Sequence, residues 1–120
     1  MGKLYLLSTG FVPVAEEELE KGVDILQYKI SVDAAKNLLK QGFISAVGHE
    51  STAKFMSQIL GMDIPVNRTA VWLRVGDRAI GFVLKVRLPE GKVLTEEELK
   101  QIPFYLVYSR VLSPDQIEVI

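Results

Sequence analysis

The sequence predicts an α+β fold, in which a mixed sheet of about five strands has helices packed on one side. Short strand-like apolar runs alternate with helix-like segments that have recognisable start and stop residues. Nearly half of the 120 residues (48%) are hydrophobic, so residues 1–120 are expected to form one domain with its own core. The strand-like runs are residues 3–7, 23–30, 43–47, 68–75, 78–86 and 104–112.

Two segments in the first half of the chain are predicted to be helices with defined ends. The hydroxyl of Ser31 can cap a helix over residues 32–41, and Gly42 ends it. A second helix is predicted over residues 50–60, where apolar side chains recur at helical spacing and Gly61 follows. Before these, residues 15–22 fit either a short helix or a solvated loop.

The second half of the chain contains a predicted β-hairpin. Residues 68–75 and 78–86 flank Gly76 and Asp77, a two-residue turn signal between two apolar runs. After a loop, Thr95-Glu96-Glu97-Glu98 is a capping box that opens a short helix before the last strand.

The composition excludes several kinds of site and location. The chain has no cysteine and one histidine, so disulfides, thiol nucleophiles and zinc sites are not expected. We expect no metal and no cofactor, although carboxylate-bound magnesium stays open. Neither a signal peptide nor a run of membrane-spanning length is visible, so we expect a cytoplasmic protein without a membrane partner; if the source is a virus, the cytoplasm is the host's.

Positive charge is concentrated in the middle of the chain, although the net charge of the whole is −1. Residues 67–92 contain six Lys or Arg and two Asp or Glu, a local charge of +4. This pattern suits a small anionic ligand better than a long nucleic acid, which is not expected as a partner. The basic residues within or beside the strand-like runs are Arg68, Arg74, Arg78, Lys85 and Arg87.

The single histidine, His49, lies where a strand gives way to a helix. Gly48 has no Cβ, so a ligand can approach its backbone closely. The first N–H groups of a helix bind anions, and Ser51 and Thr52 add hydroxyl donors. An imidazole at this point would lie beside a bound phosphate and could exchange a proton with it. The alternative is that His49 serves only as an N-cap.

Three separate stretches resemble one family. "AVGHEST" (46–52), "NRT" (67–69) and "RLPEGKVLTEEEL" (87–99) resemble the small viral proteins that act as anti-CRISPR ring nucleases against type III systems, with bacterial and archaeal relatives. The resemblance covers residues 3–110. It implies an α+β homodimer that binds cyclic tetra-adenylate in a pocket at the dimer interface and linearises it without metal.

The resemblance also implies roles for individual residues. By position, His49 matches the catalytic histidine and Glu90 the active-site glutamate, while Arg68 and Arg87 match the ligand-binding arginines. The loop after the first strand departs from the pattern, because relatives carry an Asn and then a Ser there. In this chain Ser8 or Thr9 is expected to take over those ligand contacts.

The residues support a transesterification that needs no metal. The ribose 2′-OH would attack the adjacent phosphorus and leave a 2′,3′-cyclic phosphate and a 5′-OH. The 5′-oxygen leaves far more easily as a neutral alcohol, so His49 is expected to donate a proton to it. Either Glu90 accepts the 2′-OH proton, or pre-orientation of that hydroxyl replaces most of the need for a base. A two-fold dimer acting on a four-phosphate ring would cut twice and give di-adenylate.

Three other classes of function are compatible with parts of the sequence. A protein that sequesters a cyclic nucleotide or another small anion would use the same pocket without cleaving the ligand. A protein–protein adaptor would use the basic hairpin and leave His49 and Glu90 without a role. A DNA- or RNA-binding regulator is disfavoured by the near-zero net charge and by the lack of a long basic helix.

Overall fold

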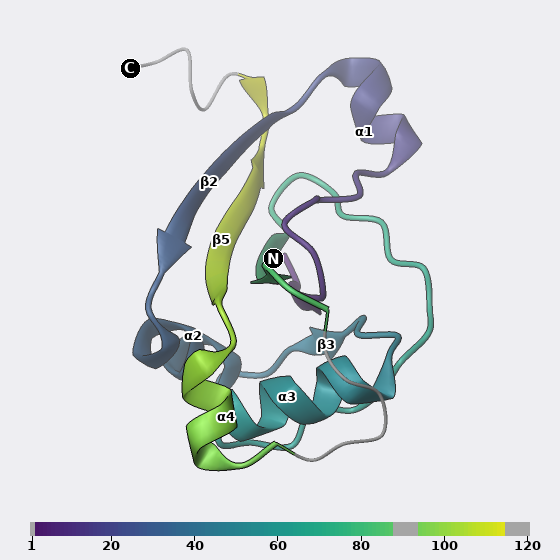
Figure 1. Cartoon of the computed structure of the whole chain (residues 1–120). Helices are drawn as coiled ribbons and strands as arrows, with labels where there is room; N and C mark the ends of the chain where they lie inside the picture. The colour runs from purple at the N-terminus through teal and green to yellow at the C-terminus, as the bar shows by residue number, and fades with distance from the viewer. Residues whose placement is uncertain (1, 88–93, 115–120) are drawn as a thin grey trace.

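A five-stranded mixed sheet organises the molecule, as the sequence predicted. The computed structural model describes residues 2–87 and 94–114. The strands lie in the order β2-β5-β4-β1-β3, with β1 parallel to both β3 and β4, and β5 antiparallel to both β4 and β2. In chain order the elements are β1 (Leu4–Leu7), α1 (Glu16–Lys21), β2 (Asp24–Ile30), α2 (Val32–Leu39), β3 (Ile44–Ser45), α3 (Glu50–Leu60), β4 (Arg78–Leu84), α4 (Glu96–Gln101) and β5 (Phe104–Leu112), shown in Figure 1.

Three helix ends lie where their capping residues predict. Ser31 Oγ accepts a hydrogen bond from the Ala34 amide at 3.1 Å and starts α2. Gly61 adopts φ 64° and ends α3, a conformation that favours glycine. The capping box of α4 forms between Thr95 and Glu98. Helix α2 ends at Leu39, two residues before the predicted end.

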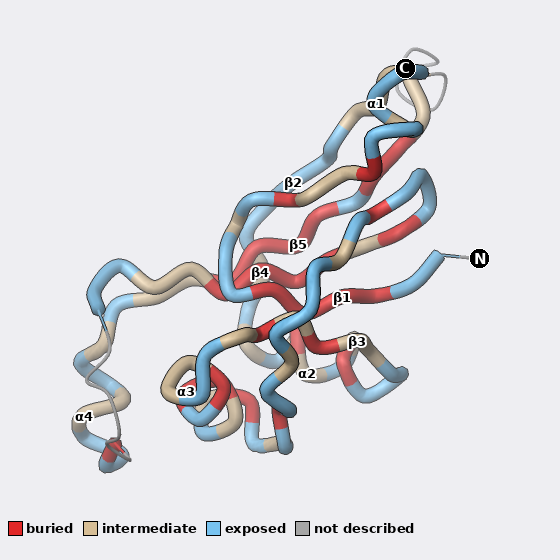
Figure 2. The backbone as a smooth tube through the Cα atoms, turned by 90° about the vertical axis from the view of Figure 1, so that its right-hand side faces the viewer, coloured by how far each residue is buried: buried red, intermediate tan, exposed pale blue. Residues whose placement is uncertain are grey.

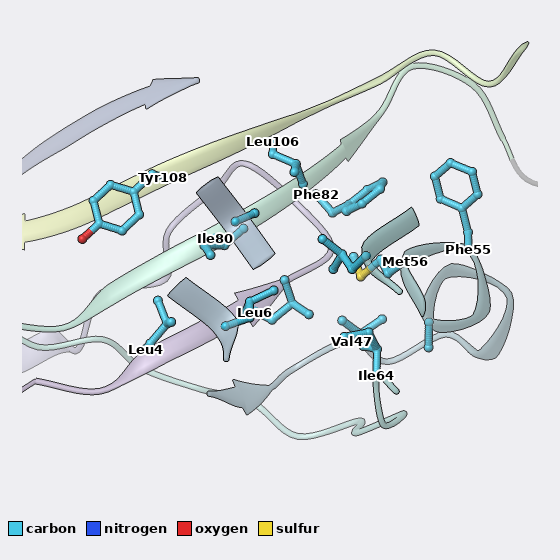
Figure 3. Packing of buried hydrophobic residues seen from close by; sticks show 14 of the residues in the cluster. Leu4, Leu6, Val47, Phe55, Met56, Ile64, Ile80, Phe82, Leu106 and Tyr108 are labelled. Atoms are coloured by element: carbon cyan, nitrogen blue, oxygen red, sulfur yellow. The ribbon is translucent and has the colours of Figure 1, made fainter. Parts of the chain in front are cut away.

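The main core lies between one face of the sheet and helices α2 and α3. Figure 2 shows both helices on the same side of the sheet, and Figure 3 shows side chains of β1, β4 and β5 near those of α3. Phe82 of β4 packs edge-on against Phe55 of α3, with ring centroids 5.4 Å apart, and stacks on Phe104 at 4.8 Å. Burial of large apolar side chains of this kind stabilises the fold by about 1.5–3 kcal/mol for each side chain.

Extended segments, rather than helices, cover the opposite face of the sheet. Residues 11–15 and 69–75 run side by side there, because the Leu73 amide donates to the Pro13 carbonyl and the Ala15 amide donates to the Leu73 carbonyl, both at 2.8 Å. Their inward side chains build a second, smaller core with residues of β1, β4 and β5. This core contains Tyr5, Leu7, Val12, Leu73, Ala79 and Val111.

The predicted β-hairpin is wrong. Strand β4 pairs with β1 on one side and β5 on the other, so neither edge of β4 is open to residues 68–75. Those residues make one isolated bridge, between Leu73 and Val14. The Asp77 carboxylate accepts hydrogen bonds from the amides of Lys3 and Arg74, both at 2.8 Å, and so ties the turn to the start of β1.

Two smaller predictions are refined by the structure. The strand expected over residues 43–47 is confined to Ile44–Ser45, and the ambiguous segment 15–22 contains helix α1. Among the described residues no helix is long and apolar enough to cross a bilayer.

Candidate functional site

Three neighbouring strands deliver the predicted site to one edge of the sheet. Because β1 lies between β3 and β4 and is parallel to both, the carboxyl ends of all three strands point the same way. Ser8 follows β1, Gly48 lies shortly after β3, and Lys85 follows β4. Loops at such strand ends commonly carry binding residues, because the strands hold them rigidly.

The structure brings Gly48 and Arg68 together, although they are far apart in sequence. Arg68 Nε donates a hydrogen bond of 2.7 Å to the Gly48 carbonyl oxygen. The chain before Arg68 is fastened alongside β3, since the Asn67 amide donates to the Val47 carbonyl at 2.8 Å and Asn67 Nδ2 donates to the Ser45 carbonyl at 2.7 Å. Arg68 is therefore held beside the start of α3 by backbone contacts, with its guanidinium exposed.

His49 occupies the N-cap position of α3 without capping the helix through its side chain. Its backbone is extended (φ −115°, ψ 131°), and its carbonyl accepts the first helical hydrogen bond, from Ala53 at 3.0 Å. The side chain makes no capping bond and is exposed. His49 is therefore the N-cap residue of α3, as the alternative expected, but its imidazole contributes no capping hydrogen bond.

The first turn of α3 supplies both attraction and some repulsion for an anion. Its leading N–H groups have no partner within the helix, and Ser51 and Thr52 lie half-buried in this turn. Glu50 also lies there, but its carboxylate pairs with Lys54 at 3.2 Å. An exposed pair of this type is weak, so it reduces the local negative charge without fixing the geometry of the turn.

No hydrogen bond or ion pair within residues 2–87 and 94–114 links the other predicted site residues to this group. Arg87 is exposed beyond the end of β4 and forms no hydrogen bond or ion pair within residues 2–87 and 94–114. Arg74 pairs with Glu17 at 3.6 Å. Arg78 begins β4, roughly 20 Å from the far end of that strand, and donates to the Tyr108 hydroxyl at 3.4 Å. Arg68, Arg74 and Arg78 therefore do not form one site, and Glu90 lies outside the described residues.

A second basic cluster near the same edge went unrecognised in the sequence. The ammonium groups of Lys29 and Lys85 lie 5.2 and 5.7 Å from the ring centroid of Tyr105. No ion pair with a carboxylate neutralises either lysine in the described part of the chain. The cluster depends on the pairing of β2 with β5, so no local pattern around Lys29 could have indicated it.

The loop after β1 is fixed against β4 and forms part of a pocket. A Cβ added to Gly81 would collide with the carbonyl oxygen of Thr9, so only glycine permits this close approach. Gln27 Nε2 also donates to the Gly10 carbonyl at 2.7 Å. Ser8 and Thr9 line a pocket of about 250 Å³. Gly48 and His49 do not line it, so this pocket lies beside the α3 N-terminus rather than over it.

Tyr5 has a shifted pKa, but it lies in the second core and not at the candidate phosphate site. Burial, with a contribution from the negative charge of Asp77, raises the pKa of the Tyr5 hydroxyl above its ordinary value. Tyr5 therefore stays neutral at physiological pH and supplies packing to the second core.

Comparison with known proteins identifies the family. The fold is similar to that of B116 of Sulfolobus turreted icosahedral virus, with a TM-score of 0.70 and 28% identity over 88% of this chain and 98% of that chain. The sequence is 41% identical over 109 residues to the uncharacterized protein ORF117 of Acidianus two-tailed virus. The aligned region covers 88% of this chain and 90% of that protein. The sequence is also 37% identical over 84 residues to the uncharacterized protein YddF of Bacillus subtilis, which covers 66% of this chain and 78% of YddF. Since residues 4–106 match the family described as STIV B116-like, the chain belongs to that family, which joins archaeal virus proteins to a bacterial relative.

Proposed function

We propose that the protein is a metal-independent ring nuclease, which binds cyclic tetra-adenylate at a dimer interface, linearises it and so switches off type III CRISPR signalling. One observation carries the proposal. His49 lies exposed at the start of α3, its side chain makes no capping bond, and it directly follows Gly48, which Arg68 contacts. Metal-free phosphodiester chemistry requires phosphate-binding groups and a proton donor, and a helix start, an arginine and an exposed histidine can supply them.

Phosphate binding is assigned to the start of α3 and to Arg68. Because Arg68 donates through Nε to the Gly48 carbonyl, its two terminal nitrogen atoms stay available for phosphate oxygens. The hydroxyls of Ser51 and Thr52 add donors in the same turn. A charge-assisted hydrogen bond of this kind contributes about 1.5–3 kcal/mol, so a few of them account for a large part of ligand affinity.

His49 acts on the leaving group in this mechanism. The ribose 2′-oxygen attacks phosphorus, the bond from phosphorus to the 5′-oxygen breaks, and His49 donates a proton to that oxygen. The proton of the 2′-OH passes to Glu90, or to water where pre-orientation of the hydroxyl suffices. The products are a 2′,3′-cyclic phosphate and a 5′-OH. Arg68 and Arg87 stabilise the charge on the phosphorane.

The decisive experiment is incubation of the purified protein with cyclic tetra-adenylate in EDTA, followed by chromatography. We expect di-adenylate with a 2′,3′-cyclic phosphate, and we expect a ring with 2′-deoxyribose at every position to bind and stay intact. Loss of activity in EDTA with recovery in magnesium would contradict the metal-free mechanism. Tight binding with the ring returned unchanged would instead make the protein a sequestering protein.

A further inference from the structure

Two aromatic residues with unusually exposed side chains line an apolar pocket beside the candidate phosphate site. The side chains of Phe11 and Trp72 both line the 250 Å³ pocket, and they are 73% and 60% exposed. Large aromatic side chains are usually more deeply buried, so their joint exposure at one pocket suggests a ligand surface. Neither ring contacts another aromatic ring within the part of the chain that the structure describes.

Backbone hydrogen bonds hold both walls in place. The Phe11 amide donates to Thr9 Oγ1 at 3.2 Å, which fixes the loop after β1. Trp72 directly precedes Leu73, whose amide and carbonyl are both bonded to the segment 13–15. Val12 and Leu73 point into the second core, so alternation along extended backbone turns Phe11 and Trp72 outward. The two rings therefore lie on two adjoining segments that hydrogen bonds hold together.

The pocket and the candidate phosphate site share the same two stretches of chain. Ala46 and Thr69 line the pocket, and they lie two residues before Gly48 and one residue after Arg68. The pocket therefore adjoins, along both stretches of chain, the residues assigned to the phosphate. Ser8, Thr9 and Thr69 also line the pocket, and each carries a hydroxyl that can donate a hydrogen bond.

We propose that this pocket binds a nucleobase of the substrate, with the base stacked on Trp72 and Phe11 and with its polar edge toward the hydroxyls of Ser8, Thr9 and Thr69. The inference rests on the proposed function, because the phosphate at Arg68 sets where the base lies. A flat group with apolar faces and a polar edge fits walls of this composition, and aromatic side chains bind bases of single-stranded nucleic acids in this way.

The single tryptophan of the chain makes the proposal directly testable. Emission from Trp72 is to be recorded during titration with adenosine 5′-monophosphate and, separately, with ribose 5-phosphate. We expect the nucleotide to quench the emission and the sugar phosphate to leave it unchanged. Phe11→Ala is expected to weaken nucleotide binding by roughly 5- to 150-fold, which corresponds to about 1–3 kcal/mol for a stacked base. Leu19→Ala, which removes another large exposed apolar side chain, in α1 and outside the pocket, is expected to leave nucleotide binding unchanged.

The outcomes separate this inference from the proposed function. If the protein cleaves cyclic tetra-adenylate but the nucleotide and the sugar phosphate act alike on Trp72, the base pocket is wrong and the nuclease stands. If the nucleotide quenches Trp72 but the ring is not cleaved, the pocket stands and the nuclease is wrong. If Trp72→Ala converts a dimer into a monomer and leaves the nucleotide affinity unchanged, a second copy covers the two rings and the inference is overturned.

Discussion

At the scale of single residues, His49 offers the sharpest test of the proposed chemistry. His49→Ala removes no capping bond, because the side chain makes none, so its cost in stability is expected to be well below the ~1 kcal/mol of a lost cap. If His49 donates the proton, single-turnover cleavage is expected to fall by roughly 10²–10⁴-fold while ligand binding stays nearly unchanged. Thermal unfolding, calorimetry and quenched-flow kinetics on the same variant separate these effects.

A sulfur substrate checks which step His49 serves. Replacing the bridging 5′-oxygen with sulfur gives a leaving group that needs no proton. His49→Ala is then expected to cleave the sulfur substrate nearly as fast as the unaltered protein does. Slow cleavage of both substrates by the variant would move His49 to positioning or to the role of base.

Two exposed arginines, one near the site and one far from it, test whether ligand binding depends on a charge at the site or only on the net charge of the molecule. Arg87 follows β4, whereas Arg110 of β5 lies opposite Arg78, at the other end of β4. Arg87→Ala is expected to weaken binding of the uncleavable 2′-deoxy ring, because each charge-assisted phosphate contact contributes about 1.5–3 kcal/mol. Arg110→Ala, the matched control, is expected to leave the dissociation constant unchanged in calorimetry. Equal losses in both variants would remove Arg87 from the site.

The sequence predicts only those residues of the site that lie together in one short stretch. This stretch contains Gly48, His49, Ser51 and Thr52. Its local sequence also shows the change from strand to helix that makes these residues candidates for anion binding. The exposed rings of Phe11 and Trp72 were not predicted, because alternation in the sequence does not say which face of a segment the rest of the chain covers. Their exposure depends on the crossing of two segments over the sheet.

At the scale of elements, the same distinction between local and distant contacts explains the wrong hairpin. Helix boundaries depend on caps within a few residues, so Ser31, Gly61 and Thr95 predicted them well. The pairing of β4 depends on β1, which lies more than seventy positions earlier in the sequence: Leu4 pairs with Arg78. The turn signal at Gly76-Asp77 does not show which strand pairs with β4. The same two residues can join two strands that pair with each other, or can join an extended segment to a strand that pairs elsewhere.

Two glycines allow a test of how the loops at the sheet edge are held. Gly81→Ala is expected to push Thr9 away from β4, because the new Cβ meets the Thr9 carbonyl oxygen. Overpacking of this kind costs about 1–3 kcal/mol, so the Tm is expected to fall by about 4 °C or more. For Gly48→Ala the nearest atom is Arg68 Cγ at 3.4 Å, an ordinary contact. This variant is expected to keep its Tm and to lose ligand affinity, measured by calorimetry, because the Cβ occupies the space through which phosphate approaches. An unchanged affinity would show that the ligand does not contact the Gly48 backbone.

At the scale of the whole molecule, the sheet has one long edge strand whose side chains stay largely exposed among residues 2–87 and 94–114. β2 is the outermost strand in the sheet order, and its side chains Ile25, Leu26 and Tyr28 are between 43% and 50% exposed. An exposed apolar edge strand favours association with another chain, because its backbone groups and apolar side chains stay unpaired. This feature supports the homodimer that the proposed function requires.

The last prediction therefore concerns two copies acting on one ring. Light scattering is expected to give the mass of a dimer at micromolar concentration, and a monomer mass would contradict the proposal. Cleavage products then report whether the two copies share one ligand. Two His49 side chains facing opposite phosphates cut a four-phosphate ring twice and release di-adenylate. A mixed dimer of one unaltered chain and one His49→Ala chain, isolated through two different affinity tags, holds one intact histidine. It is expected to open the ring once and to accumulate linear tetra-adenylate, because the second cut lacks its proton donor. Di-adenylate formed by the mixed dimer as fast as by the unaltered dimer would show that each chain acts alone on the whole ring.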